Sequence, residues 1–314
     1  MKLLFLMVLL FLAWSDSALG QPLKEIRIGS SDISFSNFST YYARDRKFFE
    51  KEGFDAKIII VKTEAALPAL SAGELDYTTF STSAIDAALR GLPLRLIAVT
   101  VKQPVIGLVV REGVNQVHDL KGKRIGISSL GGLTHVAALA VLKHYGLNPK
   151  DVTLLAIGSG VARLVAMRKG GLDAALMNSP QDIQAVKEGF KVLLDVGTVY
   201  QLPFGGLSTT LTKMGENPAE VKQVIRAVLL ATQALLKPEN RDDAINHAAA
   251  LFKIERGTAA EFHRRMVSAL SPTGVVELDK IRLAIESAVD RGLIQKPLEP
   301  EAVVDFSIVR NMRF

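Results

Sequence analysis

The chain has 314 residues, 48% of them hydrophobic and 22% charged, which is enough to bury a large core and to build two lobes. It contains no cysteine, so disulfides, thiol nucleophiles and acylated-cysteine membrane anchors are excluded. The formal net charge is +6, yet acids and bases are interspersed and no basic run with interleaved aromatic residues occurs, so we do not expect nucleic-acid binding.

The first twenty residues have the pattern of a secretory leader. Lys2 precedes an apolar run over 3–13, and small residues two apart, Ala18 and Gly20, close the segment. The run is too short for a stable membrane span, which needs about 20 apolar residues. We expect cleavage after Gly20 and a periplasmic protein without a lipid anchor. An uncleaved anchor is the alternative.

The residues after the leader predict two α/β units in succession. In the first unit we expect strands over 26–30, 57–62 and 77–80, and helices over 39–52 and 65–72. In the second we expect strands over 124–128, 152–157 and 174–177, and helices over 134–145 and 161–169. Strands that alternate with helices in this way predict mainly parallel sheets with crossover helices on their faces.

A weak internal repeat supports this division. Arg27-Ile28-Gly29 recurs 97 residues later as Arg124-Ile125-Gly126, and each copy opens an expected strand. At the same offset Gly73, Leu75 and Asp76 recur as Gly170, Leu172 and Asp173. The repeat therefore predicts two similar lobes with a cleft between them.

The rest of the chain is helical in pattern. Apolar residues spaced three and four apart predict helices over 218–236, 241–252, 258–269 and 278–291. This region has too few strand patterns to form a third lobe, so we expect it to pack back onto the first.

The loops that follow the expected strands are rich in Ser, Thr, Asn and Gly. In open α/β sheets a ligand binds beyond the carboxyl ends of the strands, so these loops are expected to face the cleft. The predicted ligand-binding residues are Ser31, Asp32, Ser34, Phe35, Ser81, Thr82, Gln103, Ser129, Gly131, Gly132, Thr134, Asn178 and Ser179.

Several of these residues have two interpretations. The loop over 128–134 is the best candidate for an anionic group, because its glycines allow close approach and a helix N-terminus follows, yet Ser and Thr also serve as helix caps. Asp32 either caps the next helix or takes a ligand amine. Phe35 either stacks on the ligand or packs in the core.

No catalytic motif appears. The five histidines are His118, His135, His144, His247 and His263; they are scattered, with no paired metal-ligand spacing. There is no nucleophile elbow and no phosphate-binding loop, and a dinucleotide fingerprint fails because Arg163 stands where its third glycine would be. We expect no catalytic residue, no cofactor and no metal.

Four segments carry a resemblance to a known family. The stretches 42–54, 70–77, 119–127 and 171–175 are similar to motifs of the sulfonate/nitrate/taurine-type solute-binding proteins of ABC importers, a group that includes binders of thiamine-pyrimidine precursors. The resemblance covers roughly 26–218. It implies an α/β, two-lobed type II periplasmic binding fold, with 24–102 plus 211–314 as lobe one and 103–210 as lobe two.

The resemblance also implies a function. We expect a non-enzymatic, monomeric component of an ABC importer that binds a small organic solute, anionic or heteroaromatic, and delivers it to a membrane permease. The family's cleft contacts fall on the loops already chosen. Two alternatives share the fold. One is a pyrimidine synthase, whose relatives carry a cysteine-rich motif that is missing here. The other is a ligand-sensing domain.

Overall fold

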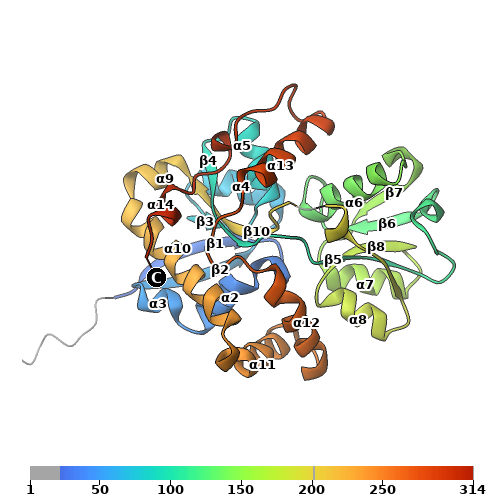
Figure 1. Ribbon diagram of the computed structural model, residues 1–314, viewed down its shortest axis with the longest axis horizontal. Coiled ribbons are helices and arrows are strands. Elements are labelled where there is room, and N and C mark those ends of the chain that lie inside the picture. Colours follow the sequence, from blue (N-terminus) through green and yellow to red (C-terminus); the bar gives the residue numbers. More distant parts are fainter. Residues whose placement is uncertain (1–21, 201, 314) are drawn as a thin grey trace, which may run out of the picture.

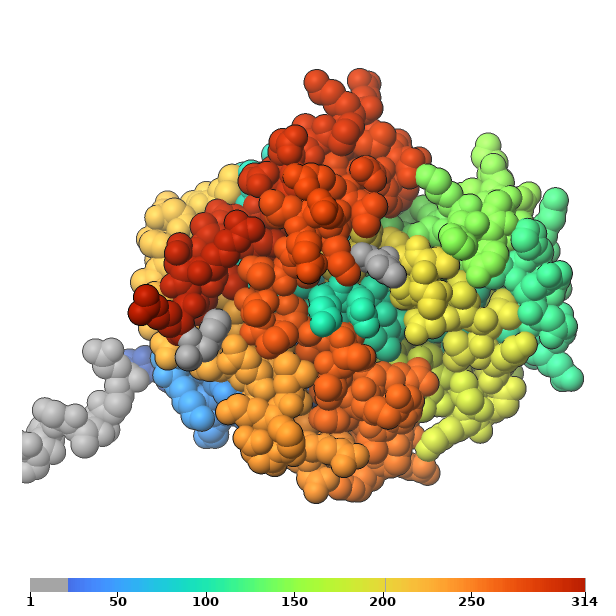
Figure 2. All heavy atoms as spheres, viewed as in Figure 1, coloured from blue at the N-terminus to red at the C-terminus, as the bar shows by residue number. Residues whose placement is uncertain are grey.

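The computed structural model describes residues 22–200 and 202–313, so the leader predicted over 1–20 lies outside the described residues. Two α/β bodies stand side by side, each built on one five-stranded sheet (Figure 1). In the space-filling view the green and yellow atoms of the middle of the chain form the right-hand body, and the two ends of the chain form the left-hand body (Figure 2).

The first sheet is mainly parallel with one reversed strand. Strand β1 runs parallel to β2 and β3, whereas β10 lies antiparallel between β3 and β4. In spatial order the strands are β2 (Phe54–Ile60), β1 (Lys24–Ser30), β3 (Tyr77–Thr78), β10 (Gly205–Thr210) and β4 (Leu94–Val101).

The second sheet repeats this arrangement. Strand β6 runs parallel to β7 and β8, and β5 lies antiparallel between β8 and β9. In spatial order the strands are β7 (Thr153–Ala156), β6 (Arg124–Ile127), β8 (Ala174–Asn178), β5 (Ile106–Val110) and β9 (Lys191–Asp195). The chain crosses between the sheets after β4 and returns after β9. Because β10 pairs within the first sheet, we propose that lobe two ends before β10 rather than at residue 210.

The side chains of the internal repeat make the same contacts in both bodies. The carboxylate of Asp76 accepts a hydrogen bond from the backbone N–H of Arg27 at 2.8 Å, and Asp173 accepts one from Arg124 at 2.9 Å. The two guanidinium groups donate to the carbonyls of Gly73 and Gly170 at 2.8 and 2.9 Å. Each set of contacts ties the start of the first strand of a unit to the turn before its third strand.

The repeated strand glycines are explained by packing. A Cβ atom on Gly29 would lie 2.7 Å from the side chain of Leu75, and one on Gly126 would lie 2.5 Å from that of Leu172. Both leucines are buried, so neither position can accept a larger residue without moving the core. The repeat in the sequence thus records one packing arrangement used twice.

Helices cover both faces of each sheet. The second body carries α6 (Leu133–His144), α7 (Gly160–Arg168) and α8 (Gln181–Lys187). The first carries α4 (Thr63–Ser71), α5 (Thr82–Leu89), α9 (Leu211–Glu216) and α10 (Pro218–Leu236), together with α11 (Arg241–Phe252), α12 (Arg256–Ala269), α13 (Leu278–Asp290) and α14 (Ser307–Arg310). The C-terminal helices pack on the first body, as α10 does on α2 (Phe38–Asp45) and α3 (Phe48–Lys51).

The helix predicted over 39–52 is two helices in the structure. Lys47 has a left-handed backbone with φ of +60°, which ends the run of α2 and starts α3 in a new direction. The change of direction places Phe49 in the core, where it is 1% exposed. No helix in the described part of the chain is long and apolar enough to span a membrane.

Candidate functional site

A cavity lies where the carboxyl ends of the strands of both bodies face each other. Its volume is about 40 Å³ in this conformation, which is room for a few water molecules. We call it the cleft cavity. Its walls include seven of the residues predicted from the sequence: Ser31, Asp32, Ser81, Thr82, Gly132, Thr134 and Asn178.

Asn37 shapes the loop after β1, which forms one wall of the cleft cavity. Its side-chain Nδ2 donates to the Ser30 hydroxyl and to the Asp32 carbonyl, both at 2.9 Å. The Ser30 hydroxyl donates to the same carbonyl at 2.9 Å. These bonds hold the backbone of Asp32 and leave its carboxylate with one weak contact among the described residues, the Ser31 hydroxyl at 3.5 Å.

The opposite wall is the loop that runs into α6. Thr134 accepts a hydrogen bond from the backbone N–H of Ser128 at 2.7 Å, which closes the loop onto the start of its own helix. Gly131 has a φ of +71°, and a Cβ on Gly132 would lie 2.5 Å from the Ser129 hydroxyl. The backbone path therefore favours glycine at 131, whereas a side chain at 132 would require the Ser129 hydroxyl to move. The N-terminus of a twelve-residue helix faces the cavity and favours a negative charge there.

Two buried polar atoms in the cavity wall have no hydrogen-bond partner among the described residues. They are the hydroxyl of Ser81 and Oδ1 of Asn178. Nearly all buried polar groups in folded proteins are hydrogen-bonded, because an unpaired one costs about 1–3 kcal/mol. The two atoms lie at the same cavity and come from different bodies. The cavity is therefore suited to a polar molecule that hydrogen-bonds to both.

Arg163, on α7, is a second unsatisfied group close behind this wall. Its side chain is fully buried and is the largest such side chain in the described chain. One of its terminal nitrogens, Nη1, donates to the carbonyl of Gly158, but Nε and Nη2 have no partner among the described residues. The N–H of Gly158 donates to the carbonyl of Ser128 at 3.0 Å, and Ser128 lines the cleft cavity.

Two charges of opposite sign lie near the cavity, Asp32 in its wall and Arg163 behind it. Burial lowers the pKa of the Arg163 guanidinium to about 10, and the negative charge of Asp32 partly opposes that effect. Arg163 belongs to the second body and Asp32 to the first. The cavity wall thus supplies a carboxylate, hydroxyls and an amide, and a buried cation of the second body lies behind it.

The other predicted residues do not line the cleft cavity. Ser34 caps the short 3-10 helix over Phe35–Asn37, where its N–H donates to the Asn37 side chain at 3.0 Å. Phe35 is fully buried and packs edge-on against Phe262 with ring centres 5.6 Å apart, so it belongs to the core rather than to a stacking surface. Ser179 is buried and donates to Asp182 at 2.6 Å.

Gln103, Ser129 and Gly131 also lie outside the cavity wall. Gln103 is on the crossing between β4 and β5. The carbonyl of Ser129 accepts from the N–H of Gly132 at 3.2 Å, within the turn. The N–H of Gly131 donates to Nδ1 of His135 at 2.9 Å, so this histidine supports the loop.

The sequence did not indicate Ser36, Asn37, Thr63, Thr79 or Phe204 in the cavity wall, or Arg163 behind it. Ser83 and Ser128, also in the wall, lie in loops that the sequence did indicate. For Arg163, however, the helical pattern carries a signal. Positions 160, 163, 164 and 167 form the buried stripe of α7, so an arginine stands where the helical pattern requires an apolar residue. A charged residue is rarely fully buried unless it is paired, so an arginine on this stripe is a sign of a polar site nearby.

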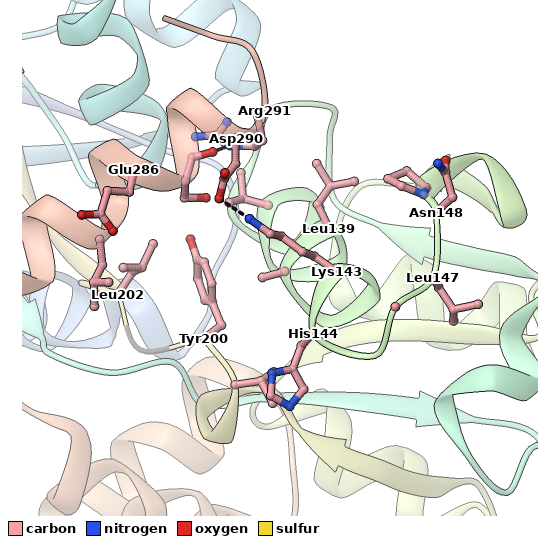
Figure 3. Close-up of a pocket in the computed structure, with 17 residues that line it drawn as sticks. Leu139, Lys143, His144, Leu147, Asn148, Tyr200, Leu202, Glu286, Asp290 and Arg291 are labelled. Carbon is pink, nitrogen blue, oxygen red and sulfur yellow. Dashed lines mark hydrogen bonds and ion pairs between the residues drawn. The ribbon is translucent and has the colours of Figure 1, made fainter. Parts of the chain in front are cut away.

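A larger groove of about 1050 Å³ lies on the surface between α6 and α13 (Figure 3). Lys143 reaches across it from α6 to Asp290 on α13, at 2.5 Å, and Arg291 is paired with Asp86 by two bonds of 2.7 Å. The groove runs along the sides of helices and not at strand ends, and these charged groups are already paired. We therefore place the functional site in the cleft cavity despite its smaller volume.

Among the described residues, four polar contacts join the two bodies around the cavity. The Ser83 hydroxyl donates to the Gly131 carbonyl at 3.4 Å, directly beside it. Farther out are the ion pairs Arg265–Asp182 at 2.8 Å, Lys187–Glu255 at 3.0 Å and Lys143–Asp290. The bodies therefore meet in this conformation, which explains why the cavity is small.

The family model described as "NMT1/THI5 like" matches residues 35–241, about two thirds of the chain. The chain belongs to the NMT1/THI5-like family. The predicted resemblance to sulfonate-, nitrate- and taurine-type binding proteins is thereby confirmed, since members of those groups are among the proteins to which this NMT1/THI5-like chain is similar.

Curated relatives of this NMT1/THI5-like chain include both binding proteins and enzymes. The riboflavin-binding protein RibY of Chloroflexus aurantiacus is 27% identical over 67% of this chain, and the taurine-binding periplasmic protein of Escherichia coli is 26% identical over 68%. A 4-amino-5-hydroxymethyl-2-methylpyrimidine phosphate synthase of Candida albicans is 27% identical over 62%. The alignments span 62 to 66% of the length of these relatives.

Solved structures confirm the predicted two-lobed periplasmic binding fold. A protein from Bordetella bronchiseptica superposes with a TM-score of 0.80 at 20% identity, covering 91% of this chain and 96% of its own. The periplasmic aliphatic sulphonate binding protein SsuA of Escherichia coli superposes with a TM-score of 0.71 at 19% identity, covering 90% and 97%. At these identities the likeness of the NMT1/THI5-like chain to both proteins concerns the fold alone.

Proposed function

We propose that this protein is the extracytoplasmic solute-binding component of an ABC importer, which closes its two bodies around a small organic solute. The observation that carries the proposal is the cleft cavity, where Ser81 and Asn178 present buried polar atoms from opposite bodies that no other described residue hydrogen-bonds. A solute that satisfies both atoms contacts both bodies only when they are closed. Binding then shifts the equilibrium toward the closed shape.

The comparisons support this proposal over catalysis. The relative from Escherichia coli is named as a periplasmic taurine-binding protein, and the solved SsuA structure is described as a periplasmic sulphonate-binding protein. The leader predicted over 1–20 is consistent with the same compartment. The protein's partner would be a membrane permease that binds the closed form.

The experiment measures binding and turnover with one purified protein. We expect thermal stabilisation by a solute from a panel of sulfonates, carboxylates, pyrimidines and amines, saturating at one solute per chain, with no new product detected by mass spectrometry. Asn178→Leu keeps the branched side-chain skeleton and replaces the unpartnered oxygen and the amide nitrogen with methyl groups, which also narrow the cavity. It should weaken binding by about 10-fold or more while leaving the melting temperature of the solute-free protein unchanged.

Asn115→Leu is the matched control, because Asn115 is exposed and far from the cavity in the chain's second body. It should bind as the wild type does. Normal binding by Asn178→Leu would remove the cleft cavity as the site. Sustained product formation would instead favour an enzyme related to the pyrimidine phosphate synthases among the relatives.

A further inference from the structure

The buried guanidinium of Arg163 is the least satisfied charge in the described structure. It is fully buried, and two of its three nitrogens have no acceptor among the described residues. A buried charge is costly, and the attraction of Asp32 offsets the cost for Arg163 only in part, since no carboxylate among the described residues hydrogen-bonds to this guanidinium. An anionic group at the adjoining wall of the cleft cavity, beside Ser128 and the N-terminus of α6, would offset the rest.

The wall that the first body contributes carries a negative charge and would attract a cation. Asp32 lines it, and its carboxylate has only the 3.5 Å contact with Ser31 among the described residues. Asn37 fixes the backbone of Asp32 by bonding its carbonyl, so the position of the carboxylate is set by the loop and not by an ion pair. This carboxylate would attract a cationic or strongly hydrogen-donating group.

We propose that the solute is a small zwitterion, with its anionic end against the Arg163 side of the cleft cavity and its ammonium end against Asp32. This inference rests on the proposed function and specifies the class of solute. Arg163 and Asp32 belong to opposite bodies, so a molecule that pairs with both charges spans the cleft. The cavity is only about 40 Å³ in this conformation, which favours a small solute with a short spacer between its two charges.

Singly charged solutes fit this pair of residues less well. A simple anion would pair with Arg163 but would bring a second negative charge close to Asp32 in a poorly solvated space. A simple amine would pair with Asp32 and leave the guanidinium unsatisfied. Only a solute with both charges compensates both residues, so the discrimination comes from repulsion as well as attraction.

The test compares three matched probes by isothermal titration calorimetry. They are β-alanine, propionate and propylamine, with taurine, ethanesulfonate and ethylamine as a second set. We expect the zwitterion in at least one set to bind about 30-fold or more tightly than its two singly charged partners, the effect of losing one member of a desolvated charge pair.

Two substitutions locate the ends of the solute. Asp32→Asn should remove the preference for the zwitterion over the plain anion, because the repulsion and the attraction disappear together; Asp279→Asn, at an exposed site on α13, is its control. Arg163→Met should abolish binding of the zwitterion and of the plain anion, while the melting temperature of the solute-free protein stays the same or rises. Arg168→Met, on the same helix but exposed and paired with Glu188, should leave binding unchanged.

The outcomes separate this inference from the proposed function. If a neutral or singly charged solute binds as tightly as the zwitterion, the zwitterion proposal fails while solute binding stands. If no probe or panel compound binds at all, the proposed function fails as well. If Arg163→Met lowers the melting temperature or unfolds the protein, Arg163 is a structural residue and its assignment to the solute is wrong.

Discussion

Lys213 joins three acidic or phenolic side chains that the fold brings together between β3 and the start of α10. Its ammonium group lies 2.9 Å from Asp76 and 2.7 Å from Glu220, and the hydroxyl of Tyr77 donates to the same glutamate at 3.0 Å. Burial alone would raise the pKa of Glu220. The hydrogen bonds from Lys213, Lys24 and Tyr77 outweigh burial and hold the pKa below its usual range.

Glu220→Gln should therefore reduce the free energy of unfolding by about 1–3 kcal/mol at neutral pH, measured by urea denaturation. The folded pKa of Glu220 lies below the unfolded value, so its stabilisation is complete above the unfolded pKa and is lost as the pH falls through the folded pKa. The difference between wild type and variant should shrink on acidification below about pH 4. Glu239→Gln, at an exposed position, should change little, and a pH-independent difference would contradict this assignment.

At the residue scale, the sequence predicted the cleft residues whose position depends on the end of a strand, and failed where the position depends on a distant packing partner. Ser81, Thr82, Thr134 and Asn178 follow directly from the rule that ligands bind at the carboxyl ends of strands, and each lines the cleft cavity. Phe35 does not line the cavity. It packs against Phe262, more than two hundred residues away, and nothing local in the sequence indicates this contact. Side-chain direction at a loop depends on distant partners, which a local pattern does not contain.

At the scale of the elements, the two strands that complete each sheet were not predicted: β10 and β4 in the first sheet, and β5 and β9 in the second. The repeated units account for β1, β2 and β3 and for β6, β7 and β8, all parallel. Strands β5 and β10 enter each sheet antiparallel from the segments that cross between the bodies. Their pairing partners are far away in the sequence. The local βαβ pattern therefore predicts the parallel strands of each sheet and not the antiparallel strand that joins them.

Strand β10 enters the first sheet so tightly that its first residues must be glycine. A Cβ on Gly206 would lie 2.1 Å from the carbonyl oxygen of Ala98 on β4, and a backbone atom cannot swing aside. Gly206→Ala should lower the free energy of unfolding by about 3 kcal/mol, measured by chemical denaturation. Gly215→Ala is the matched control, because Gly215 lies in α9 with no atom near the added methyl group. This substitution should raise the free energy of unfolding by about 0.5–1 kcal/mol. Equal effects of the two substitutions would contradict the packing argument.

At the scale of the whole molecule, the ion pair between Arg265 and Asp182 links α12 of one body to α8 of the other. Asp182 is 2% exposed, and burial raises its pKa although Ser179 and Arg265 oppose that rise. Its carboxylate is costly to bury unless Arg265 is beside it. Ser179 and Ile183 bond this carboxylate from its own body, and Arg265 is its partner from the other. We infer that this one contact between the bodies favours closure.

Arg265→Gln should accordingly shift the solute-free protein toward an open shape without altering the cleft cavity. The radius of gyration from small-angle X-ray scattering should increase, and the apparent solute affinity should fall by about 5-fold, because about 1 kcal/mol of closing energy is lost. Arg264→Gln removes the same charge one residue away, where the side chain is exposed and pairs only with Glu261 of its own helix, and should change neither quantity. Equal affinity and equal radius for the two variants would mean that Asp182 is buried for the stability of its own body, and that closure depends on the solute alone.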